Sequence, residues 1–504
     1  MINMTKHFIT LLSVITLLIG SCNNPSEPGT KEIEIFAFND FHGAIMEDYH
    51  QTGALKFFSY LKREQQRENV LTLDQGDTWQ GSIYSNFNHG ELLNDLMCEA
   101  KISARTVGNH DFDWGTGYVK ANTARTYNGY KIPTLAANVY DYNFETKTIG
   151  NVQQYDIGAP THTYKLANGL KVGVVGVIGE KQITSITSSY VQDIAFKNHI
   201  NVIKEEATKL RQEGCDVVIA AAHADQDDLK GNNLKNYVDL VLCGHSHQQE
   251  SFKEGDLYYY QAYAYGGSLN HIFLNYNNGK VTVNTRKTVA MSSDNITAAL
   301  NGYIDEEIDK IIKRYNEECD EYANVTMAKQ AQGYFDSNME LPNLMCRAIY
   351  DEAKANGYDI NFSFTNEART DLLKNNWKYS DIYEAFPFDN DIYLVEITGK
   401  EIRDEVCNWN NVYVPDDGNR TFNLNDKYLV AIIDFLVFHT NKYRNYDFFP
   451  DNNGAYVGKL NKNYREILRD WLISNKYPEE GILKAEDFDS NVYNHQKEFN
   501  FINE

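Results

Sequence analysis

Seven side chains of the kinds that bind transition metals follow apolar runs in the first half of the chain. They comprise two carboxylates, one amide and four imidazoles: Asp40, His42, Asp77, Asn109, His223, His245 and His247. Mixed oxygen and nitrogen ligands suit Zn, Mn, Fe or similar ions, whereas structural zinc sites are often closed by thiolates. Water bound to such ions has its pKa lowered to about 7 and can attack a phosphate ester at neutral pH. The set predicts a hydrolytic metal centre.

The number of ligands is enough for two divalent ions. We expect Asp77 to be shared between ions that lie about 3.5–4 Å apart. The remaining ligands divide into two sets of three, one for each ion: Asp40, His42 and His247, and Asn109, His223 and His245. The two histidines of the stretch GHSH (244–247) therefore serve different ions.

His110 stands next to the ligand Asn109 and cannot point in the same direction. We expect it to act as a general acid toward a leaving alkoxide, or as a hydrogen-bond donor to a transition-state oxygen. A carboxylate must orient this imidazole and favour its charged form. Asp113 can reach it across a turn, and Asp111 is the alternative.

Strand and helix patterns alternate through the part of the chain that carries these residues. Val, Ile and Leu dominate the runs that we expect to be buried strands, at 33–38, 69–74, 171–179, 216–223 and 238–244. Stretches such as 53–69 and 201–213 are typical of helices, so the pattern indicates a layered α/β domain. In open α/β sheets, ligands bind beyond the carboxyl ends of the strands, where these side chains can converge.

Length and patterning predict two domains. A chain of 504 residues exceeds the size of most single hydrophobic cores. We expect a first domain over 32–294, a linker helix over 295–322, where isoleucines recur at helical spacing, and a second α/β domain over 323–504. The formal charge of −23 argues against a nucleic-acid polymer or an anionic membrane surface as partner, because both would need a basic face.

The N-terminus has the pattern of a bacterial lipoprotein signal. A short polar start is followed by an apolar run too short to span a membrane, and small residues then precede Cys22. We expect residues 1–22 to be the signal peptide, with Cys22 lipidated, and residues 23–31 to be a tether. The protein would then lie in the bacterial cell envelope, in the periplasm or at the surface, held to the membrane only by lipid.

The ordered segments NDFHG, GD, GNHD, H and GHSH resemble the motifs of the calcineurin-like metallophosphoesterases. More narrowly, NDFHG, LDQGDTWQGS, GNHDFDWG and GHSH resemble those of the 5′-nucleotidase family. The resemblance implies a four-layer αββα first domain, a C-terminal α/β substrate-binding domain and two divalent metal ions. It also places the family's catalytic dyad on His110 and Asp113.

In the second half, YSDIYEAFPFDNDIYLVEITGKEI (379–402) resembles the segment that holds the nucleobase in this family. The resemblance implies that Phe388 stacks on the base, that Asn390 bonds to its edge and that Phe435 is a second stacking partner. Arg369 matches an arginine of the family in a loop that contacts the substrate. Two glycine-rich loops of the family are replaced here, by FTNEART (364–370) and by HTNKYRNYDFFPDNNG (439–454).

These features predict a dimetal hydrolase that dephosphorylates nucleoside 5′-monophosphates outside the cytoplasm. The two replaced loops keep other substrates open on the same site: 2′,3′-cyclic nucleotides, nucleotide sugars or general phosphomonoesters. A hypothesis of another class is a surface binding lipoprotein on a decayed enzyme scaffold. The complete ligand set argues against it, because loss of activity usually removes metal ligands first.

Overall fold

The computed structural model of the protein describes residues 29–48, 51–143, 146, 148–407, 411–416, 418–437, 456–489 and 498–503. The expected signal peptide with Cys22, most of the 23–31 tether and the replaced loop 439–454 lie outside these residues. Within the described ranges, no helix has both the length and the apolar character needed to cross a membrane.

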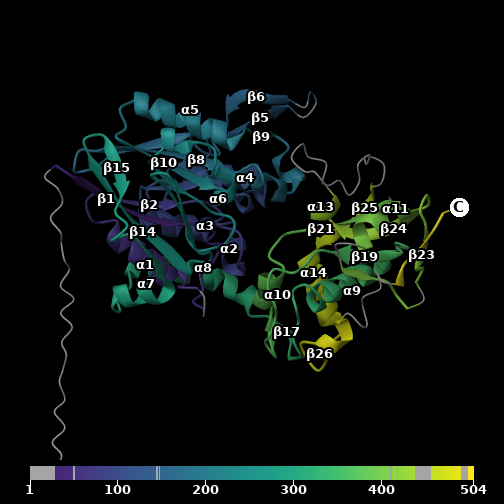
Figure 1. Cartoon of the computed structure of the whole chain (residues 1–504). Coiled ribbons are helices and arrows are strands. Elements are labelled where there is room, and N and C mark those ends of the chain that lie inside the picture. The colour runs from purple at the N-terminus through teal and green to yellow at the C-terminus, as the bar shows by residue number, and fades with distance from the viewer. Residues whose placement is uncertain are drawn as a thin grey trace, which may run out of the picture.

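Two mixed β-sheets form the centre of the first domain (Figure 1). The first has the order β15 (Lys280–Val283), β14 (Ser268–Asn277), β1 (Lys31–Phe38), β2 (Val70–Asp74), β3 (Ala104–Thr106) and β4 (Thr134–Leu135), and β16 (Val289–Ser292) pairs with β14. The second has the order β12 (Glu250–Glu254), β13 (Leu257–Gln261), β11 (Leu240–Leu242), β10 (Val217–His223), β8 (Lys171–Ile178) and β7 (Thr161–Lys165). β1, β2 and β3 run parallel to one another, and β10 runs parallel to β11. All five strands lead to metal-ligand candidates.

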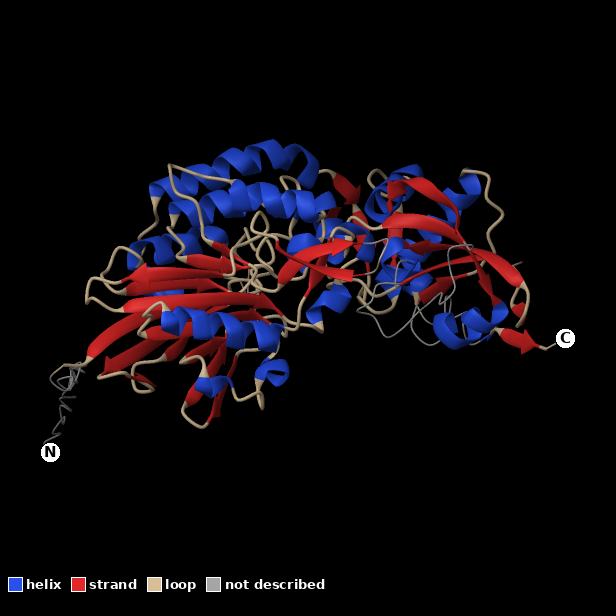
Figure 2. Cartoon of the chain, turned by 90° about the horizontal axis from the view of Figure 1, so that it is seen from above, coloured by secondary structure: helices blue, strands red, loops and turns tan. Residues whose placement is uncertain are grey.

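The two sheets pack face to face, and helices cover their outer faces (Figure 2). Apolar residues of both sheets form a common core, as Ile35, Leu73, Val174 and Ile219 show. Helices α1 (Ala54–Glu64), α3 (Glu91–Glu99) and α8 (Glu306–Ala323) bury their apolar sides on the first sheet, and α5 (His199–Gln212) packs on the second. The predicted helix–sheet–sheet–helix architecture is confirmed.

Short elements fill the connections of the first domain. They include a small sheet and several short helices: β5 (Val139–Asn143), β6 (Thr148–Gln153), β9 (Ile194–Phe196), α2 (Ile83–Asn86), α4 (Thr116–Ala124) and α6 (Gln226–Leu229). A turn of 3₁₀ helix over His110–Phe112 begins four residues after the end of β3. This turn separates the directions of Asn109 and His110.

Two helices stand where one linker helix was expected over 295–322. α7 (Ser293–Leu300) ends at Asn301 and Gly302, which both take positive φ values, 50° and 81°. This left-handed backbone ends a helix. α8 then begins after Asp305, whose carboxylate accepts hydrogen bonds from the first backbone N–H groups. The apolar spacing that predicted the helix does form the buried face of α8, which includes Ile308 and Ile311.

The second domain is built on a five-stranded sheet. Its order is β22 (Asn411–Tyr413), β19 (Phe362–Thr365), β24 (Lys427–Ile433), β21 (Asp391–Thr398) and β25 (Tyr456–Asn463). Helices α9 (Glu340–Ala355) and α14 (Tyr464–Ser474) pack against each other and share its apolar core. Smaller elements surround them: β17 (Thr326–Ala328), β18 (Gln330–Gln332), β20 (Trp377–Lys378), α10 (Tyr379–Ala385), α11 (Gly399–Glu401), β23 (Thr421–Asn423), α13 (Asp434–Val437), β26 (Ile482–Lys484) and β27 (Asn500–Ile502).

The two domains are joined by polar contacts as well as by α8. The side-chain amides of Gln80 and Asn86 both donate to the backbone carbonyl of Pro387, at 3.1 and 2.9 Å. Both amides are buried, and Ile83 packs beside them against Cys319 of α8 and Tyr383 of the second domain. This junction holds the loop after α10 against the edge where β1 and β2 end.

A buried arginine supports the loops at that edge. Arg105 is fully buried on β3, and its guanidinium donates to Asp111 at 2.6 Å and lies 3.7 Å from Asp74. Its charge also stacks over Trp79, 3.8 Å from the ring. Asp74 and Asp111 in turn accept the backbone N–H groups of Gly76 and Gly108. The network therefore ties together the turns that follow β2 and β3.

We predict that Arg105→Met destabilises the first domain by about 3–5 kcal/mol, because it leaves two buried carboxylates without their cation. Urea unfolding in the presence of a chelator, followed by tryptophan fluorescence, measures this loss without a contribution from metal binding. The exposed Arg286 provides the control, since Arg286→Met should change the free energy of unfolding by less than about 0.5 kcal/mol. Equal stability of the two variants would contradict the role of the network.

Candidate active site

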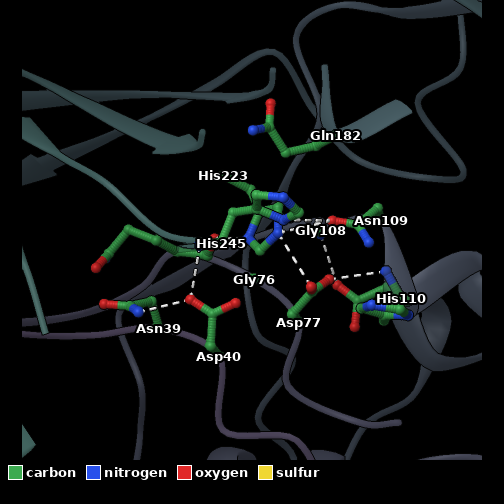
Figure 3. Close-up of polar contacts among 12 residues, drawn as sticks. Asn39, Asp40, Gly76, Asp77, Gly108, Asn109, His110, Gln182, His223 and His245 are labelled. Atoms are coloured by element: carbon green, nitrogen blue, oxygen red, sulfur yellow. Dashed lines mark hydrogen bonds and ion pairs between the residues drawn. The ribbon is translucent and has the colours of Figure 1, made fainter. Parts of the chain in front are cut away.

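All seven predicted metal ligands come together at one edge of the two sheets. Each lies at the carboxyl end of a strand or in the loop that follows, and Figure 3 shows five of them pointing toward a common centre. Ligand-capable atoms lie within 4.8 Å of one another in two separate groups: Asp40, His42 and His247, and Asp77, His223 and His245. The structure thus places the two histidines of the GHSH loop in different groups.

The first group is compact and faces the second domain. The Nε2 atoms of His42 and His247 lie 3.1 Å apart. Oδ1 of Asp40 lies 3.8 Å from the first ring and 3.4 Å from the second. Oδ2 of Asp77 is 3.9 Å from Nε2 of His42, so Asp77 borders this group too.

The second group is centred on the same Asp77 carboxylate. Its Oδ2 lies 3.1 Å from Nε2 of His223. Oδ1 of Asn109 lies 3.0 Å from that same nitrogen and 3.2 Å from Nδ1 of His245. Oδ2 of Asp77 therefore lies within 4 Å of imidazole nitrogens of both groups, the position that sharing between two ions requires.

Backbone carbonyls orient two of the imidazoles. Nδ1 of His42 lies 2.9 Å from the Gln80 carbonyl, and Nδ1 of His223 lies 2.8 Å from the Gln75 carbonyl. A carbonyl can only accept, so each Nδ1 carries the proton and each Nε2 keeps its lone pair for a ligand. This is the usual outer contact of a metal-binding histidine.

Five ligand candidates adopt a left-handed backbone. Their φ values lie between 47° and 81°: Asp40, His42, Asp77, His245 and His247. Asp and His tolerate this region better than most residues, yet each such position costs of order 1–3 kcal/mol. Strain of this kind persists only where the surroundings fix it, and it gathers at functional sites.

Glycines let these loops approach one another. A Cβ on Gly108 would lie 2.1 Å from Oδ1 of Asp77, so no larger residue fits there without displacing this carboxylate. Gly244 takes no positive φ, but a Cβ there would meet His223 and Asp40 at 3.1 and 3.3 Å. Gly244 therefore serves close packing, while the turn itself is made by His245 and His247.

The carboxylates present the chemistry that a divalent ion needs. Oδ1 of Asp40 and Oδ2 of Asp77 are buried and accept no hydrogen bond from the described residues. Burial would raise the pKa of Asp40, but His247 and His223 lower it to about 2; the pKa of Asp77 is likewise held well below its usual range, by His223 and His110. Two ionised carboxylates that accept no hydrogen bond on these oxygens fit a cation.

The imidazoles fit the same conclusion. Burial and the neighbouring His247 hold the pKa of His42 well below its usual value, so this ring is neutral. Burial opposes a charge on His223 as well, but Asp77 and Asp40 raise its pKa to about 10. Divalent ions would supply that positive charge instead and leave the Nε2 lone pair of His223 free for coordination.

His110 lies beside the metal-ligand groups without joining them. Nδ1 of His110 is 2.8 Å from Oδ2 of Asp113, and its backbone N–H donates to Oδ1 of Asp77 at 2.8 Å. Burial would lower its pKa, but Asp113 and Asp77 outweigh burial and raise it. The alternative partner, Asp111, is held by Arg105 on the far side of the turn.

The predicted substrate residues of the second domain share a cleft with these groups. The cleft has a volume of about 450 Å³ and is lined from the first domain by Asp77, His110, Asp113, His245 and His247. Arg369, Phe388, Asn390 and Phe435 line it from the second domain. The ring of Phe388 lies nearly parallel to that of His110, 5.4 Å away.

Several residues of the site were not foreseen. Ser185, Thr187 and Tyr190 line the cleft from a connection that carries no recognisable motif. Arg465, buried on α14, donates to the carbonyls of Phe386 and Phe388 and pairs with Asp389, so it fixes the loop that carries Phe388. The sequence signal available for it was its helical spacing from Leu468 and Leu472, which puts an arginine on the buried face of α14.

We predict that the metal-free protein binds about two divalent ions per chain and is stabilised by them. Asp77→Asn should lower the bound metal to one ion or fewer, since this carboxylate borders both groups. Elemental analysis after reconstitution with Mn²⁺ or Zn²⁺ gives the stoichiometry, and the rise in melting temperature gives an independent reading. The exposed Asp156→Asn is the control and should retain both ions. Two ions in the Asp77→Asn protein would contradict sharing.

Comparison with protein families gives two matches in chain order. Residues 33–249 match the calcineurin-like phosphoesterase family, and residues 321–429 match the 5′-nucleotidase C-terminal domain. The first segment contains every metal-ligand candidate, and the second contains Arg369, Phe388 and Asn390. Phe435 lies just beyond it.

Individual relatives are distant. The chain is 24% identical over 407 residues to the endonuclease YhcR of Bacillus subtilis. The matched region covers 74% of this chain and 32% of that protein. It is 23% identical over 450 residues to the cell wall protein Lmo0130 of Listeria monocytogenes, covering 74% of this chain and 55% of the relative. The chain thus spans at most about half the length of these two relatives.

A solved structure has the same fold over nearly the whole chain. The 5′-nucleotidase precursor from Thermus thermophilus superposes with a TM-score of 0.70 at 18% identity, covering 90% of this chain and 99% of that one. The matched families, their order and this shared two-domain fold agree with the geometry of the site. The chain belongs to the 5′-nucleotidase family of calcineurin-like metallophosphoesterases, which are metal-dependent hydrolases of phosphate esters.

Proposed function

We propose that the protein hydrolyses nucleoside 5′-monophosphates to nucleoside and phosphate. The observation that carries the proposal is the cleft, in which an arginine, an amide and two aromatic rings of the second domain face the metal-ligand groups of the first. Clefts between domains are usual places for small ligands. A nucleotide offers one chemical group to each part of this wall.

Arg369 is the residue that we assign to the phosphate. Its positive charge lies close enough to oppose protonation of both His42 and His110, although the nearby carboxylates still raise the pKa of His110. Among the described residues its guanidinium makes no hydrogen bond or ion pair, although the chain carries a net charge of −23. A guanidinium binds phosphate oxygens in a bidentate manner and would offset the acidic character of the chain locally.

Phe388, Asn390 and Phe435 are the residues that we assign to the nucleoside. Aromatic side chains stack on any base, and an amide both donates to and accepts from a base edge. Asn390 is buried and precedes β21, and Phe388 is fixed from behind by Arg465. The loop that carries Phe388 is therefore anchored, which supports its assignment to the nucleoside.

The catalytic residues that we propose are His110 and Asp113. Divalent ions held by the seven ligands would supply a water of lowered pKa and would stabilise charge on the phosphate oxygens. His110 gives its proton to the leaving 5′-oxygen, and Asp113 holds the imidazole in the protonated form that this step needs. The products are a nucleoside and inorganic phosphate.

We also propose that the protein works outside the cytoplasm, tethered through Cys22. The apolar run before Cys22 supports this assignment, and one of the relatives is a cell wall protein. A lipid would hold the enzyme at the envelope without a membrane-spanning helix.

We expect the metal-loaded protein to show its highest kcat/KM with AMP or UMP in a panel that also contains UDP-glucose, 2′,3′-cyclic AMP and 4-nitrophenyl phosphate. Phe388→Ala should raise KM for AMP by about tenfold, the loss expected for one stacking contact. The exposed Phe252→Ala is the control and should leave KM unchanged. No preference for 5′-nucleotides over 4-nitrophenyl phosphate would refute the proposal.

We expect His110→Ala to lower kcat by about 10²–10⁴-fold, the usual contribution of a general acid. Its metal content should stay normal, because His110 belongs to neither ligand group. His89→Ala is a matched control, since this half-buried histidine stacks on Tyr118 and lines no part of the cleft. Normal turnover in the His110→Ala protein with both ions present would remove the residue from its role.

A further inference from the structure

Asp389 is a carboxylate in the wall of the cleft that belongs neither to the metal-ligand groups nor to the residues assigned above to the substrate. It stands between Phe388 and Asn390, and all three residues line the cleft. The side chain of Asp389 is 32% exposed, so part of it faces the open space. A negative charge repels the phosphate of a substrate. Its position in the cleft therefore suits binding only if a cation balances the charge and a hydrogen-bond donor of the ligand meets it.

Arg465 supplies the balancing charge. This arginine is 2% exposed, and Asp389 is its only carboxylate partner among the described residues. It also donates to the hydroxyl of Tyr383 at 2.8 Å and to the carbonyl of Phe386 at 3.0 Å, and its guanidinium lies 3.7 Å from the centre of the Tyr383 ring. A buried guanidinium that is held on several sides fixes the carboxylate that it binds. Asp389 is thus held in place, and its charge is balanced locally.

This ion pair uses only one of the two carboxylate oxygens. Arg465 binds Oδ1 of Asp389, and Oδ2 accepts no hydrogen bond from the part of the chain that the structure describes. An ionised carboxylate accepts hydrogen bonds and has none to donate. A ligand group that meets Oδ2 must therefore be a donor, whereas an acceptor at the same place would be repelled.

The neighbours of Asp389 indicate which part of a nucleotide lies next to it. Phe388 is assigned to the face of the base and Asn390 to its edge, so the carboxylate between them reaches the edge as well. The bases differ there, because adenine and cytosine carry an amino group, a donor, where hypoxanthine and uracil carry an oxo group, an acceptor. A carboxylate at this edge therefore distinguishes amino bases from oxo bases.

We propose that Asp389 binds the exocyclic amino group of the base, so that the protein selects nucleotides of adenine and cytosine over those of hypoxanthine and uracil. The proposal rests on the proposed function and names the substrate class of that same site. It gives Asp389 a role in specificity and none in the chemical step.

The test compares kcat/KM within two pairs of substrates, AMP with IMP and CMP with UMP, on the metal-loaded full chain. The members of each pair differ at the amino or oxo group and the adjacent ring nitrogen, and they share the leaving 5′-oxygen. The parent protein should favour the amino member about tenfold, the value of one hydrogen bond to a charged group. Most of this difference should lie in KM, because the base is remote from the bond that breaks.

Asp389→Asn should bring both ratios close to one. The amide keeps an oxygen that accepts from Arg465, so the loop stays anchored, but it can also donate to an oxo group. We expect kcat/KM to fall for AMP and CMP and to stay the same or rise for IMP and UMP, a pattern that a merely structural role would not produce. Glu367→Gln is the matched control. It removes another exposed carboxylate of the same cleft, two residues from Arg369, and should leave both ratios unchanged.

Inhibition of the parent protein by nucleosides gives a reading that needs no variant. Adenosine should inhibit the hydrolysis of UMP about tenfold more strongly than inosine does. Equal inhibition by the two nucleosides, or a ratio that Asp389→Asn leaves unchanged in either pair, would overturn the inference. An equal change of both ratios in the Glu367→Gln protein would overturn it as well, since the effect would then belong to the charge of the cleft and not to Asp389. Failure to hydrolyse any of the four nucleotides with both ions bound would instead refute the proposed function itself.

Discussion

The structure depends on the burial of two ionised carboxylates among four imidazoles at one edge of a double sheet. Asp40 and Asp77 are almost completely buried, and the ring nitrogens around them lie 3.1–3.9 Å away. Such a concentration of charge is costly in a medium of low dielectric constant unless cations balance it. Divalent ions provide this balance and at the same time provide the chemistry of phosphate-ester hydrolysis.

The scaffold keeps these groups in place against local strain. The left-handed backbone at five ligand candidates costs free energy at each position, and hydrogen bonds behind the ligands offset it. Asp40 accepts from the His245 N–H at 2.8 Å, while Asp77 accepts from the His110 N–H. Deeper in the domain, Arg105 holds the turns after β2 and β3 together. The contacts at the sheet edge thus fix the positions of the ligands, against the backbone conformations that these residues would prefer on their own.

The second domain completes the site through few contacts. The Pro387 carbonyl accepts from Gln80 and Asn86 of the first domain, and the carbonyl of Gln80 orients His42. The residue that fixes a metal-ligand candidate therefore also fixes the loop that carries Phe388. This shared attachment links the geometry of the hydrolytic centre to that of the specificity wall.

The sequence by itself determined the fold class, the seven ligand candidates and their division into two groups. This was possible because each ligand directly follows an apolar strand, and parallel strands bring their carboxyl ends to one edge. Spacing favoured Asp113 over Asp111 as the partner of His110, and the structure adds the physical reason, since the buried Arg105 holds Asp111 away from this imidazole. The break between α7 and α8 does have a local cause, in the left-handed Asn301 and Gly302 and the N-cap Asp305. The role of Arg465 in fixing the loop of Phe388 does not, because it depends on a contact between segments far apart in the chain, which only the tertiary structure brings within a few ångströms.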